Sequence, residues 1–345
     1  MKDLPIATAY SLDDVMLIPK YNPIASRLDV DLSTVLTKNI PLQNPIMATN
    51  MATVTEVPMA KALNSKGGVG ILHRFMSIDD QIKMVNELKK DGVKPVVASI
   101  GVGNKEYIRA IELDQAGVDA VLIDVAHGHS ALVDEQLYKL KNVGIETIVG
   151  NIATYDAAMH LLNSGADALR VGIGGGKNCT TRLVTGHGVP NLTALIQASM
   201  ARDEFCNRNA VYIPIIIDGG IKNSGDIVKA LYFGADIACM GNMFAGTDES
   251  PGELINSGNG VFKKHYGLSS KDAMDTHKGG KREGIAAEGI TTMVPHKGSV
   301  IPIIDELLGG IRSGLTYSGA KNIMDLRANG QAYLLSSASR AESKL

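Results

Sequence analysis

The segment 172–182, with the sequence GIGGGKNCTTR, combines residue types that could carry chemistry. Four of its first five residues are glycines. They suit a tight loop rather than a helix or strand, because glycine loses much backbone entropy when it is ordered. The loop presents one cysteine, Cys179, near Lys177 and Arg182, whose positive charges would favour a thiolate. We therefore predict that Cys179 is a nucleophile; a flexible loop with an incidental cysteine is the alternative.

The other two cysteines, Cys206 and Cys239, fall in a predicted helix and a predicted strand, and we expect both to be buried and unreactive. Three cysteines imply no disulfide framework and favour a reducing, cytoplasmic location. Several histidines show no spacing typical of metal ligands, and we expect them to be solvated or structural. They are His127, His129, His187, His265, His277 and His296.

Two further segments are candidates for phosphate binding, Asp218-Gly219-Gly220 and Gly241-Asn242. Each ends a β-branched run, where glycine lets backbone N–H groups reach phosphate oxygens. The Asp218 carboxylate would repel a phosphate but can accept hydrogen bonds from two ribose hydroxyls. Two ordinary loops between a strand and a helix are the alternative.

These segments belong to a repeating pattern of short apolar runs, each followed by a longer amphipathic stretch. Eight runs are predicted as strands: 45–49, 68–72, 93–100, 119–125, 146–151, 168–172, 214–218 and 236–241. They lack alternation, as expected for parallel strands buried on both faces. Amphipathic segments such as 78–90, 105–116 and 130–143 predict helices outside the sheet. Eight units favour a closed (β/α)₈ TIM barrel over an open doubly wound sheet.

The active site of such a barrel lies where the strands end and the following loops begin. Polar residues follow several predicted strands, among them Asn50, His127 and Asn151. Asp124 lies near the end of the fourth strand, where it could orient a ligand amide or cap the next helix. We expect these residues and the glycine-rich segments to meet at one mouth.

Two parts of the chain lie outside the repeat. Residues 1–44 precede the first strand, and the segment LTKNIPL within them predicts a small hairpin over the barrel floor. Residues 242–320 are glycine-rich and polar and predict a large loop or flap before the last helix. We predict a single catalytic domain over residues 1–345.

Composition excludes several classes of protein. With 34 basic and 36 acidic residues the net charge is −2, so no basic field argues for a nucleic-acid partner. No stretch approaches the roughly 18 apolar residues that cross a membrane. The first residues, MKDLPIATAYSLDD, do not resemble a signal peptide.

Several motifs resemble those of the IMP dehydrogenase and GMP reductase family: GIGGGKNCTTR, IDGGIKNSGDIVKAL, GNMFAGTDESPGE and LLGGIRSGLTYSGA. LTKNIPLQNPIMATNM and GGVGILHRFMSIDDQ, nearer the start, do so as well, so the resemblance covers nearly the whole chain. It implies a (β/α)₈ barrel, usually a homotetramer, with nicotinamide-linked redox chemistry at C2 of a purine nucleoside monophosphate. Dehydrogenases commonly carry a regulatory domain after a segment like MSIDDQ; here we expect none, because the next predicted strand follows directly.

The resemblance also implies roles for single residues. Cys179 would attack C2 to form a covalent intermediate, and Asp124 would lie on the nicotinamide side. Asp218 would hold the ribose. The backbone carbonyls of Gly174, Gly176 and Cys179 would hold a potassium ion. The other substrate-binding residues implied are Lys177, Gly219, Gly220, Gly241, Asn242, Tyr266, Leu268, Ser269 and Gly289, with Leu268 and Ser269 at the base.

The two reactions of the family differ in their proton chemistry. The dehydrogenase oxidises IMP with NAD and then hydrolyses the covalent intermediate. Dehydrogenases resemble one another in using an Arg-Tyr pair on a mobile flap to activate the water. This chain has no Arg-Tyr pair, and only 13 residues separate Met274 from Glu288, which matches the flap length of the reductases. The reductase expels ammonia from GMP with the help of a Thr and a Glu, here Thr181 and Glu288, and then takes hydride from NADPH. We therefore expect a GMP reductase.

The chain also departs from the family pattern. It has GGGKN where the family usually has Gly-Pro-Gly-Ser and an apolar residue, Ala52 where both branches usually have Asp, and Gly284-Ile285 where reductases have Tyr-Arg. Two alternatives therefore stay open. One is an IMP dehydrogenase with a short flap, in which Glu288 activates water through Thr181. The other is a non-catalytic relative or an enzyme for a modified purine nucleotide.

Overall fold

The computed structural model describes residues 7–342 of the 345-residue chain, apart from 259, 268, 278–283 and 285. Eight parallel strands form a closed barrel in the order β10-β11-β4-β5-β6-β7-β8-β9. Their bounds are β4 (Ile46–Ala48), β5 (Val69–Leu72), β6 (Val97–Ile100), β7 (Ala120–Asp124), β8 (Glu146–Ile152), β9 (Ala168–Val171), β10 (Ile215–Asp218) and β11 (Ile237–Met240). The barrel prediction is confirmed. The run predicted at 93–100 is shorter at its start, because Pro95 has no backbone N–H to donate to a neighbouring strand.

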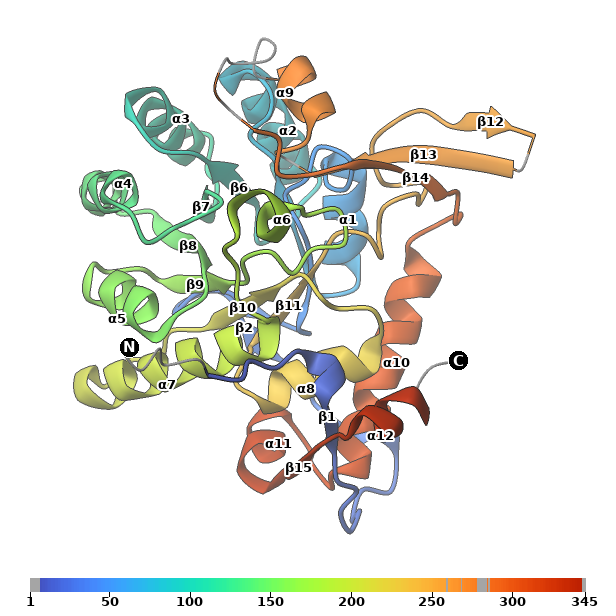
Figure 1. Ribbon diagram of the computed structural model, residues 1–345. Helices are drawn as coiled ribbons and strands as arrows, with labels where there is room; N and C mark the ends of the chain where they lie inside the picture. The colour runs from blue at the N-terminus through green and yellow to red at the C-terminus, as the bar shows by residue number, and fades with distance from the viewer. Residues whose placement is uncertain (1–6, 259, 268, 278–283, 285, 343–345) are drawn as a thin grey trace, which may run out of the picture.

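Helices surround the barrel, as Figure 1 shows. They are α1 (Val57–Ser65), α2 (Ile78–Lys90), α3 (Asn104–Gln115), α4 (Ala131–Lys141), α5 (Tyr155–Asn163), α7 (Asn191–Asn209), α8 (Ser224–Tyr232) and α10 (Ile301–Tyr317). Helix α2 has the predicted bounds. It begins after Ser77, whose hydroxyl accepts a hydrogen bond from the backbone N–H of Asp80 (3.1 Å).

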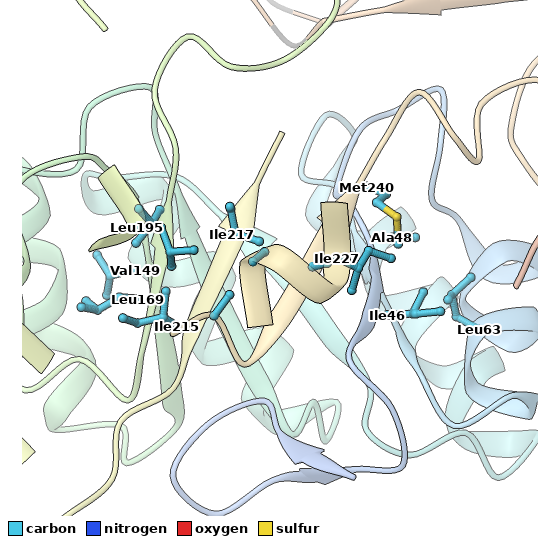
Figure 2. Packing of buried hydrophobic residues seen from close by; sticks show 14 of the residues in the cluster. Ile46, Ala48, Leu63, Val149, Leu169, Leu195, Ile215, Ile217, Ile227 and Met240 are labelled. Carbon is cyan, nitrogen blue, oxygen red and sulfur yellow. The ribbon is translucent and has the colours of Figure 1, made fainter. Parts of the chain in front are cut away.

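Alternate residues of the strands face two separate apolar layers. Met47, Ile71, Leu122 and Ile216 belong to the layer inside the barrel. Their strand neighbours pack outward against the helices, and Figure 2 shows part of this outer layer, in which residues of the strands lie beside Leu195 of α7 and Ile227 of α8. Because the strands are buried on both faces, their sequences are apolar without alternation.

The predicted hairpin is present as β2 (Thr34–Val35) and β3 (Pro41–Leu42), which pair antiparallel. Leu36 and Leu42 belong to the inner apolar layer. The hairpin directly precedes β4, so it closes the barrel at the amino ends of the strands.

The large loop or flap predicted for residues 242–320 is present as a flap, but the segment also contains a helix that was not predicted. The segment contains a three-stranded antiparallel sheet of β12 (Ile255–Ser257), β13 (Gly260–Tyr266) and β14 (Thr291–Pro295), the helix α9 (Lys271–His277) and the helix α10. Glycines of α10 lie against α8. A Cβ at Gly310 would come within 2.1 Å of Ser224 Oγ, and one at Gly314 within 2.6 Å of Val228 Cγ2. These glycines therefore permit close helix packing rather than a loop.

Two short strands near the ends of the chain pair with each other (Figure 1). Strand β1 (Val15–Leu17) pairs antiparallel with β15 (Ala332–Leu334), and α11 (Ile323–Asn329) and α12 (Ser337–Glu342) flank β15 in the sequence. Two short 3₁₀ turns, η1 (Leu12–Asp14) and η2 (Arg27–Asp29), complete the N-terminal segment.

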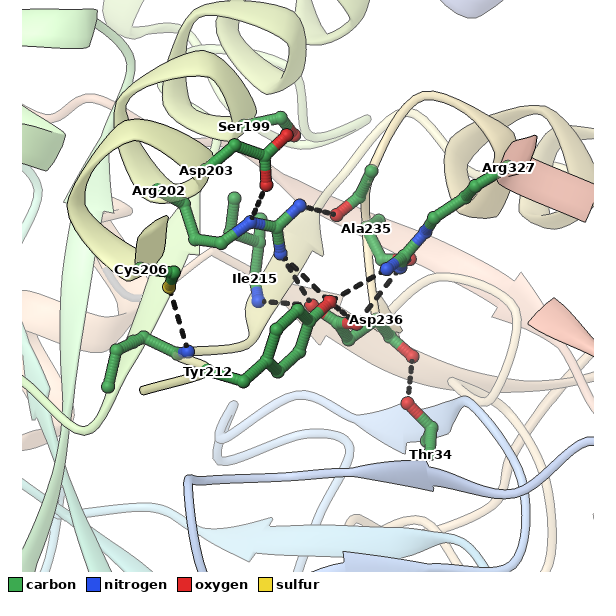
Figure 3. A network of polar contacts seen from close by, with 12 residues as sticks. Thr34, Ser199, Arg202, Asp203, Cys206, Tyr212, Ile215, Ala235, Asp236 and Arg327 are labelled. Atoms are coloured by element: carbon green, nitrogen blue, oxygen red, sulfur yellow. Dashed lines mark hydrogen bonds and ion pairs between the residues drawn. The ribbon is translucent and has the colours of Figure 1, made fainter. Parts of the chain in front are cut away.

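A buried polar network fixes the amino end of β11 (Figure 3). Asp236 accepts hydrogen bonds from Tyr212 (2.6 Å), the Ile215 backbone (2.7 Å), Arg327 (2.9 Å) and Arg202 (3.3 Å). Four donors satisfy one buried carboxylate, so this cluster has a structural role at the end opposite the predicted mouth.

The cysteines outside the glycine loop are in the predicted elements. Cys239 is fully buried in β11, and burial raises the pKa of its thiol to about 12. Cys206 in α7 is only partly buried, contrary to expectation, because it lies near the end of the helix and accepts a hydrogen bond from the Ile213 N–H (3.4 Å). Burial also raises the pKa of Cys206, so both thiols are poor nucleophiles.

Within the described part of the chain, no group of three or more His, Cys, Asp or Glu side chains could hold a metal ion. His127, His129 and His187 are exposed, and His265 is buried against Thr53. No helix among the described residues is long and apolar enough to cross a membrane.

Candidate active site

The predicted site residues gather at the carboxyl ends of the barrel strands. Asp124 is the last residue of β7, Asp218 is the last residue of β10, and Asn151 lies in β8. Gly172 and Gly241 directly follow β9 and β11. Since parallel strands of a closed barrel end on one face, these residues surround a single mouth.

The glycine-rich loop after β9 passes very close to its neighbours. Gly172 has φ +142°, and a Cβ there would lie 2.2 Å from the carbonyl oxygen of Asp218. A Cβ at Gly175 would lie 2.3 Å from Asn191 Oδ1. Real Cβ atoms are not found at such distances, so only glycine allows the loop to pack against β10 and the start of α7.

Cys179 lies at one end of a hydrogen-bonded chain of side chains. Its thiol donates to Thr181 Oγ1 at 3.2 Å, and the Thr181 hydroxyl donates to Glu288 Oε2 at 2.8 Å. Thr181 begins a short extra helix, α6 (Thr181–Thr185). All three side chains are half-buried. A sulfur nucleophile, a hydroxyl and a carboxylate thus stand in the order that a proton relay requires.

Backbone hydrogen bonds join the loop that carries Cys179 to the segment that carries Glu288. The Thr180 N–H donates to the Glu288 carbonyl (2.9 Å), and the Glu288 N–H donates to the Ser269 carbonyl (2.9 Å). Cys179 and Gly289 form an isolated antiparallel bridge. Segments that follow β9 and β13 and the one that precedes β14 therefore converge near the sulfur, although more than 100 positions separate Thr181 from Glu288 along the chain.

Asn178 anchors the flap to the glycine loop. Its side-chain amide donates to the His265 carbonyl (3.2 Å) and to Thr292 Oγ1 (3.1 Å), and its backbone carbonyl accepts from Ile290 N–H (3.0 Å). The side chain is 5% exposed. We did not predict this role; the signal was a polar residue at a position where related sequences usually have an apolar one.

Arg170 is the main residue that the sequence analysis missed. It is buried in β9, and its guanidinium lies 3.1 Å from Asp124 Oδ1 and 3.1 Å from Asp218 Oδ2. It also donates to Asn50 Oδ1 and Thr49 Oγ1, both at 2.8 Å. Burial alone would lower the pKa of Arg170, but the charges of Asp218 and Asp124 outweigh it and raise the pKa. The guanidinium therefore stays charged between the two carboxylates.

A charged residue inside the apolar run ALRV was the available signal for Arg170, because a buried charge requires partners. Arg74, in the segment LHRF, was missed as well. Its Nε lies 3.7 Å from Asp124 Oδ2, and its Nη2 donates to the Asp124 carbonyl (3.2 Å). Asp124 thus faces two arginines and is only 8% exposed.

Side chains from other parts of the chain fix the loops after β10 and β11. Gly219 and Gly220 have φ values of +81° and +75°, which favour glycine. Asn191 fixes this turn, because its amide donates to the Gly219 carbonyl at 2.5 Å. In the adjacent loop, after β11, the Lys297 ammonium donates to the Asn242 carbonyl at 3.0 Å. Neither Asn191 nor Lys297 was predicted.

The other predicted residues are located as follows. Tyr266 and Ser269 are half-buried, Lys177 is exposed, and Ala52 lies in the turn after β4. Burial raises the pKa of Tyr266. Leu268 and Ile285 lie outside the described residues.

Comparisons with known proteins identify the family. The model of the IMP dehydrogenase / GMP reductase domain matches residues 9–345. The chain is 36% identical to inosine-5'-monophosphate dehydrogenase of Borreliella burgdorferi, with 97% of this chain and 96% of that protein covered. It is also 36% identical to GMP reductase of Aliivibrio salmonicida, with 91% of each covered.

A solved structure shows the same fold. The crystal structure of a cysteine-to-alanine variant of GMP reductase from Trypanosoma brucei, in complex with guanosine 5'-monophosphate, superposes with a TM-score of 0.91 at 29% identity. The match covers 99% of this chain and 98% of that one. The family model, the two curated relatives and this structure agree: the chain belongs to the IMP dehydrogenase / GMP reductase family of oxidoreductases that act on purine nucleotides.

Proposed function

We propose that this protein is a GMP reductase, which converts GMP to IMP and ammonia with NADPH. The observation that carries the proposal is the chain from Cys179 Sγ through Thr181 Oγ1 to Glu288 Oε2, with distances of 3.2 and 2.8 Å. Such a chain can deliver a proton to the site of nucleophilic attack, which the release of an amine requires. The segment between Met274 and Glu288, whose 13 residues match the length expected of a reductase, supports the same reaction.

In this reaction the Cys179 thiolate forms a bond to C2 of the purine. A proton from Glu288, passed through the Thr181 hydroxyl, reaches the exocyclic nitrogen as the C2–N bond breaks and ammonia departs. When bound, the reduced nicotinamide supplies the hydride that C2 then accepts. The C2–S bond breaks in that step, which returns the electron pair to sulfur and releases IMP.

The surrounding residues would orient the nucleotide. Asp218 would accept hydrogen bonds from the ribose hydroxyls, since Arg170 keeps one of its oxygens in place at 3.1 Å. Gly220, Gly241 and Asn242 would direct backbone groups at the phosphate. The base would lie between the sulfur and the flap, beside Ser269 and Gly289.

Asp124 would face the nicotinamide. Its oxygens contact Arg170 (3.1 Å) and Arg74 (3.7 Å), yet a carboxylate has enough lone pairs to accept a further bond from a carboxamide. Its place at the end of β7 therefore fits a role in orienting the nicotinamide.

A potassium ion fits the glycine loop poorly. Of the three carbonyls predicted to hold it, that of Gly176 already accepts the Cys179 N–H (3.1 Å), and Lys177 brings an ammonium to the next position. Gly174 and Cys179 would have to supply most of the ligation. We assign no step of the reaction to potassium.

The test is a pair of assays that follow the absorbance of reduced nicotinamide. A GMP reductase consumes NADPH when GMP is added and releases ammonia, whereas an IMP dehydrogenase forms NADH from IMP and NAD. The 36% identity to the Borreliella burgdorferi dehydrogenase makes the second assay necessary. Turnover in the second assay alone would refute the proposal, and binding without turnover in either would favour a non-catalytic relative. A homotetramer in the cytoplasm belongs to the same proposal and can be tested by light scattering and by fractionation.

A further inference from the structure

Two lysines lie beside the loops that follow β9 and β11, and neither has an ion-pair partner among the residues that the structure describes. Lys177 is exposed in the glycine loop, two positions before Cys179. Lys297 follows β14 and contacts the loop after β11, which only β10 separates from the strand that precedes the glycine loop. Elsewhere on the surface, lysines such as Lys61 and Lys66 pair with carboxylates at 2.5–2.8 Å.

Lys297 is held in place by backbone oxygens. Its Nζ donates to the carbonyls of Asn242 (3.0 Å) and Met243 (2.9 Å), and its own N–H donates to the Gly246 carbonyl (2.9 Å). An ammonium has three donors, so one is left after these two contacts. The side-chain oxygen of Asn242 is buried without a hydrogen-bond partner, which marks the turn as incomplete.

The carboxylates nearest in sequence to this turn are engaged elsewhere. Asp248 pairs with His296 at 2.6 Å. Glu249 accepts hydrogen bonds from the Ser299 hydroxyl and the Val300 N–H, both at 2.7 Å. Neither carboxylate is therefore a partner of Lys297.

The positive charges of Lys177 and Lys297 affect the pKa of Lys297 and that of His265. Burial of its ammonium against the turn lowers the pKa of Lys297, and the charge of Lys177 lowers it further. Burial lowers the pKa of His265 to about 4, and Lys297 and Lys177 contribute to the same shift. His265 is therefore neutral near pH 7, and the local charge comes from the lysines. Asp218, which ends β10 between these two loops, is paired with Arg170.

We propose that Lys177 and Lys297 together bind the phosphate of the nucleoside monophosphate and select its doubly charged form. This inference rests on the proposed purine-nucleotide function. A phosphate monoester carries nearly two negative charges at pH 7, because its second pKa is about 6. Two ammonium groups beside the loops after β9 and β11 match this charge, and neither Asp248 nor Glu249 competes for them.

The first test compares a nucleotide with its nucleoside. GMP and guanosine are titrated calorimetrically into a Cys179→Ala protein, which cannot turn over, and into the same protein with Lys177→Gln or Lys297→Gln. A hydrogen bond to a charged group contributes about 1.5–3 kcal/mol, so each change should raise the Kd for GMP roughly 10- to 150-fold. The Kd for guanosine should change less than about 2-fold, because it has no phosphate.

Two controls separate charge from structure. Lys90→Gln makes the same charge change in the last turn of α2, at the far end of the barrel, and should leave both affinities unchanged. Lys297→Arg keeps the charge and should retain most of the affinity for GMP. Equal losses of GMP and guanosine affinity in the lysine variants would show that the lysines only support the fold of the mouth, and would overturn the inference.

The second test uses pH. In the parent protein, GMP affinity should rise from pH 5 to pH 7.5 as the phosphate loses its second proton, whose pKa is about 6. In the Lys177→Gln, Lys297→Gln double variant this rise should be much smaller, and an unchanged rise would contradict selection of the doubly charged form. If neither GMP nor IMP binds the parent protein at all, the proposed function itself fails, which is a different outcome.

Discussion

Replacement of Glu288 by glutamine tests the proton path most directly. Thr181 Oγ1 and Glu288 Oε2 are 2.8 Å apart, the usual length of an O–H···O hydrogen bond. The amide oxygen of glutamine can accept the same hydrogen bond, and the side chain has the same length. Glu288→Gln therefore removes the transferable proton and leaves the position of Thr181 and of the sulfur unchanged.

The expected loss follows from the role of a general acid. Such a group contributes roughly 10²–10⁴-fold to a rate, and each factor of ten corresponds to about 1.4 kcal/mol of barrier. Glu288 is the only carboxylate that the described residues place on the Cys179–Thr181 chain. We therefore expect GMP reduction to fall at least about 100-fold, with a much smaller change in GMP affinity.

The assay separates the two halves of the reaction. Steady-state NADPH consumption with GMP measures the complete reaction, in which the amine must be protonated. A single-turnover experiment with IMP and NADP measures only the formation of the covalent intermediate and NADPH, in which no amine departs. The first rate should fall and the second should stay near that of the wild type.

Two results would refute this reasoning. Near wild-type GMP reduction by Glu288→Gln would exclude the proton path and leave flap length as the main support for a reductase. An equal loss in both half-reactions would show that Glu288 merely positions Thr181. Thr181→Ser, which keeps the hydroxyl, serves as the matched control and should retain most of the activity.

Four further outcomes are expected. Cys179→Ala should abolish turnover while GMP binding stays measurable, and a residual rate of about a tenth of wild type would contradict covalent catalysis. Activity should depend little on potassium at constant ionic strength, because Lys177 brings a positive charge into the loop predicted to hold the cation; a many-fold stimulation over an inert cation would oppose this. Gly172→Ala should lower the Tm strongly, since its Cβ would lie 2.2 Å from a backbone oxygen, whereas Gly309→Ala in α10, where a Cβ meets nothing within 4 Å, should not. Since the pKa of His265 falls from 6.5 in the unfolded chain to about 4 in the folded protein, the unfolded state takes up the proton first as the pH drops. The free energy of unfolding should therefore fall between pH 6.5 and 4, and His265→Gln should reduce that fall in thermal unfolding measurements.

The barrel could be predicted because its strands carry an unusually plain pattern. A strand that packs against helices on one side and against the barrel interior on the other is apolar throughout, as IIID in β10 and AVLID in β7 show. The polar residue that ends each of these strands marks the mouth. Pattern alone therefore located Asp124 and Asp218 on one face.

The region after β11 could not be predicted in the same way. Helix α10 contains the sequence LLGGIRSGL, and glycine normally argues against a helix. Tertiary packing stabilises this helix, because Gly310 and Gly314 let α10 approach α8 closely. The strands of the flap are short and partly exposed, so they too depend on contacts that a local pattern does not contain.

In the candidate site, too, some residues could be predicted from the sequence and others could not. Cys179 was predicted from one segment, because the glycine-rich loop and the basic residues that suggested its role are its neighbours in sequence, whereas Thr181 and Glu288 were predicted from the family resemblance. Arg170 and Lys297 were missed, because the groups that give them a role come from other strands and loops: Asp124 and Asp218 for the arginine, and the turn after β11 for the lysine. Long-range partners are the information that a single segment lacks.

Under the proposed function, Asp218 and the two lysines would favour one orientation of a bound nucleotide. Asp218 stands at the end of β10 with Arg170 beneath it, so it attracts the hydroxyl donors of a ribose and repels a phosphate. Lys177, in the loop after β9, and Lys297, beside the loop after β11, would attract the phosphate. A nucleotide bound in the reverse sense would bring its phosphate to the carboxylate and leave both lysines unpaired, so electrostatics would disfavour it before any contact with the base is made. Because Lys177 is only two residues from Cys179, the loop that would receive the phosphate also presents the sulfur, and binding in the favoured sense would fix the distance between them.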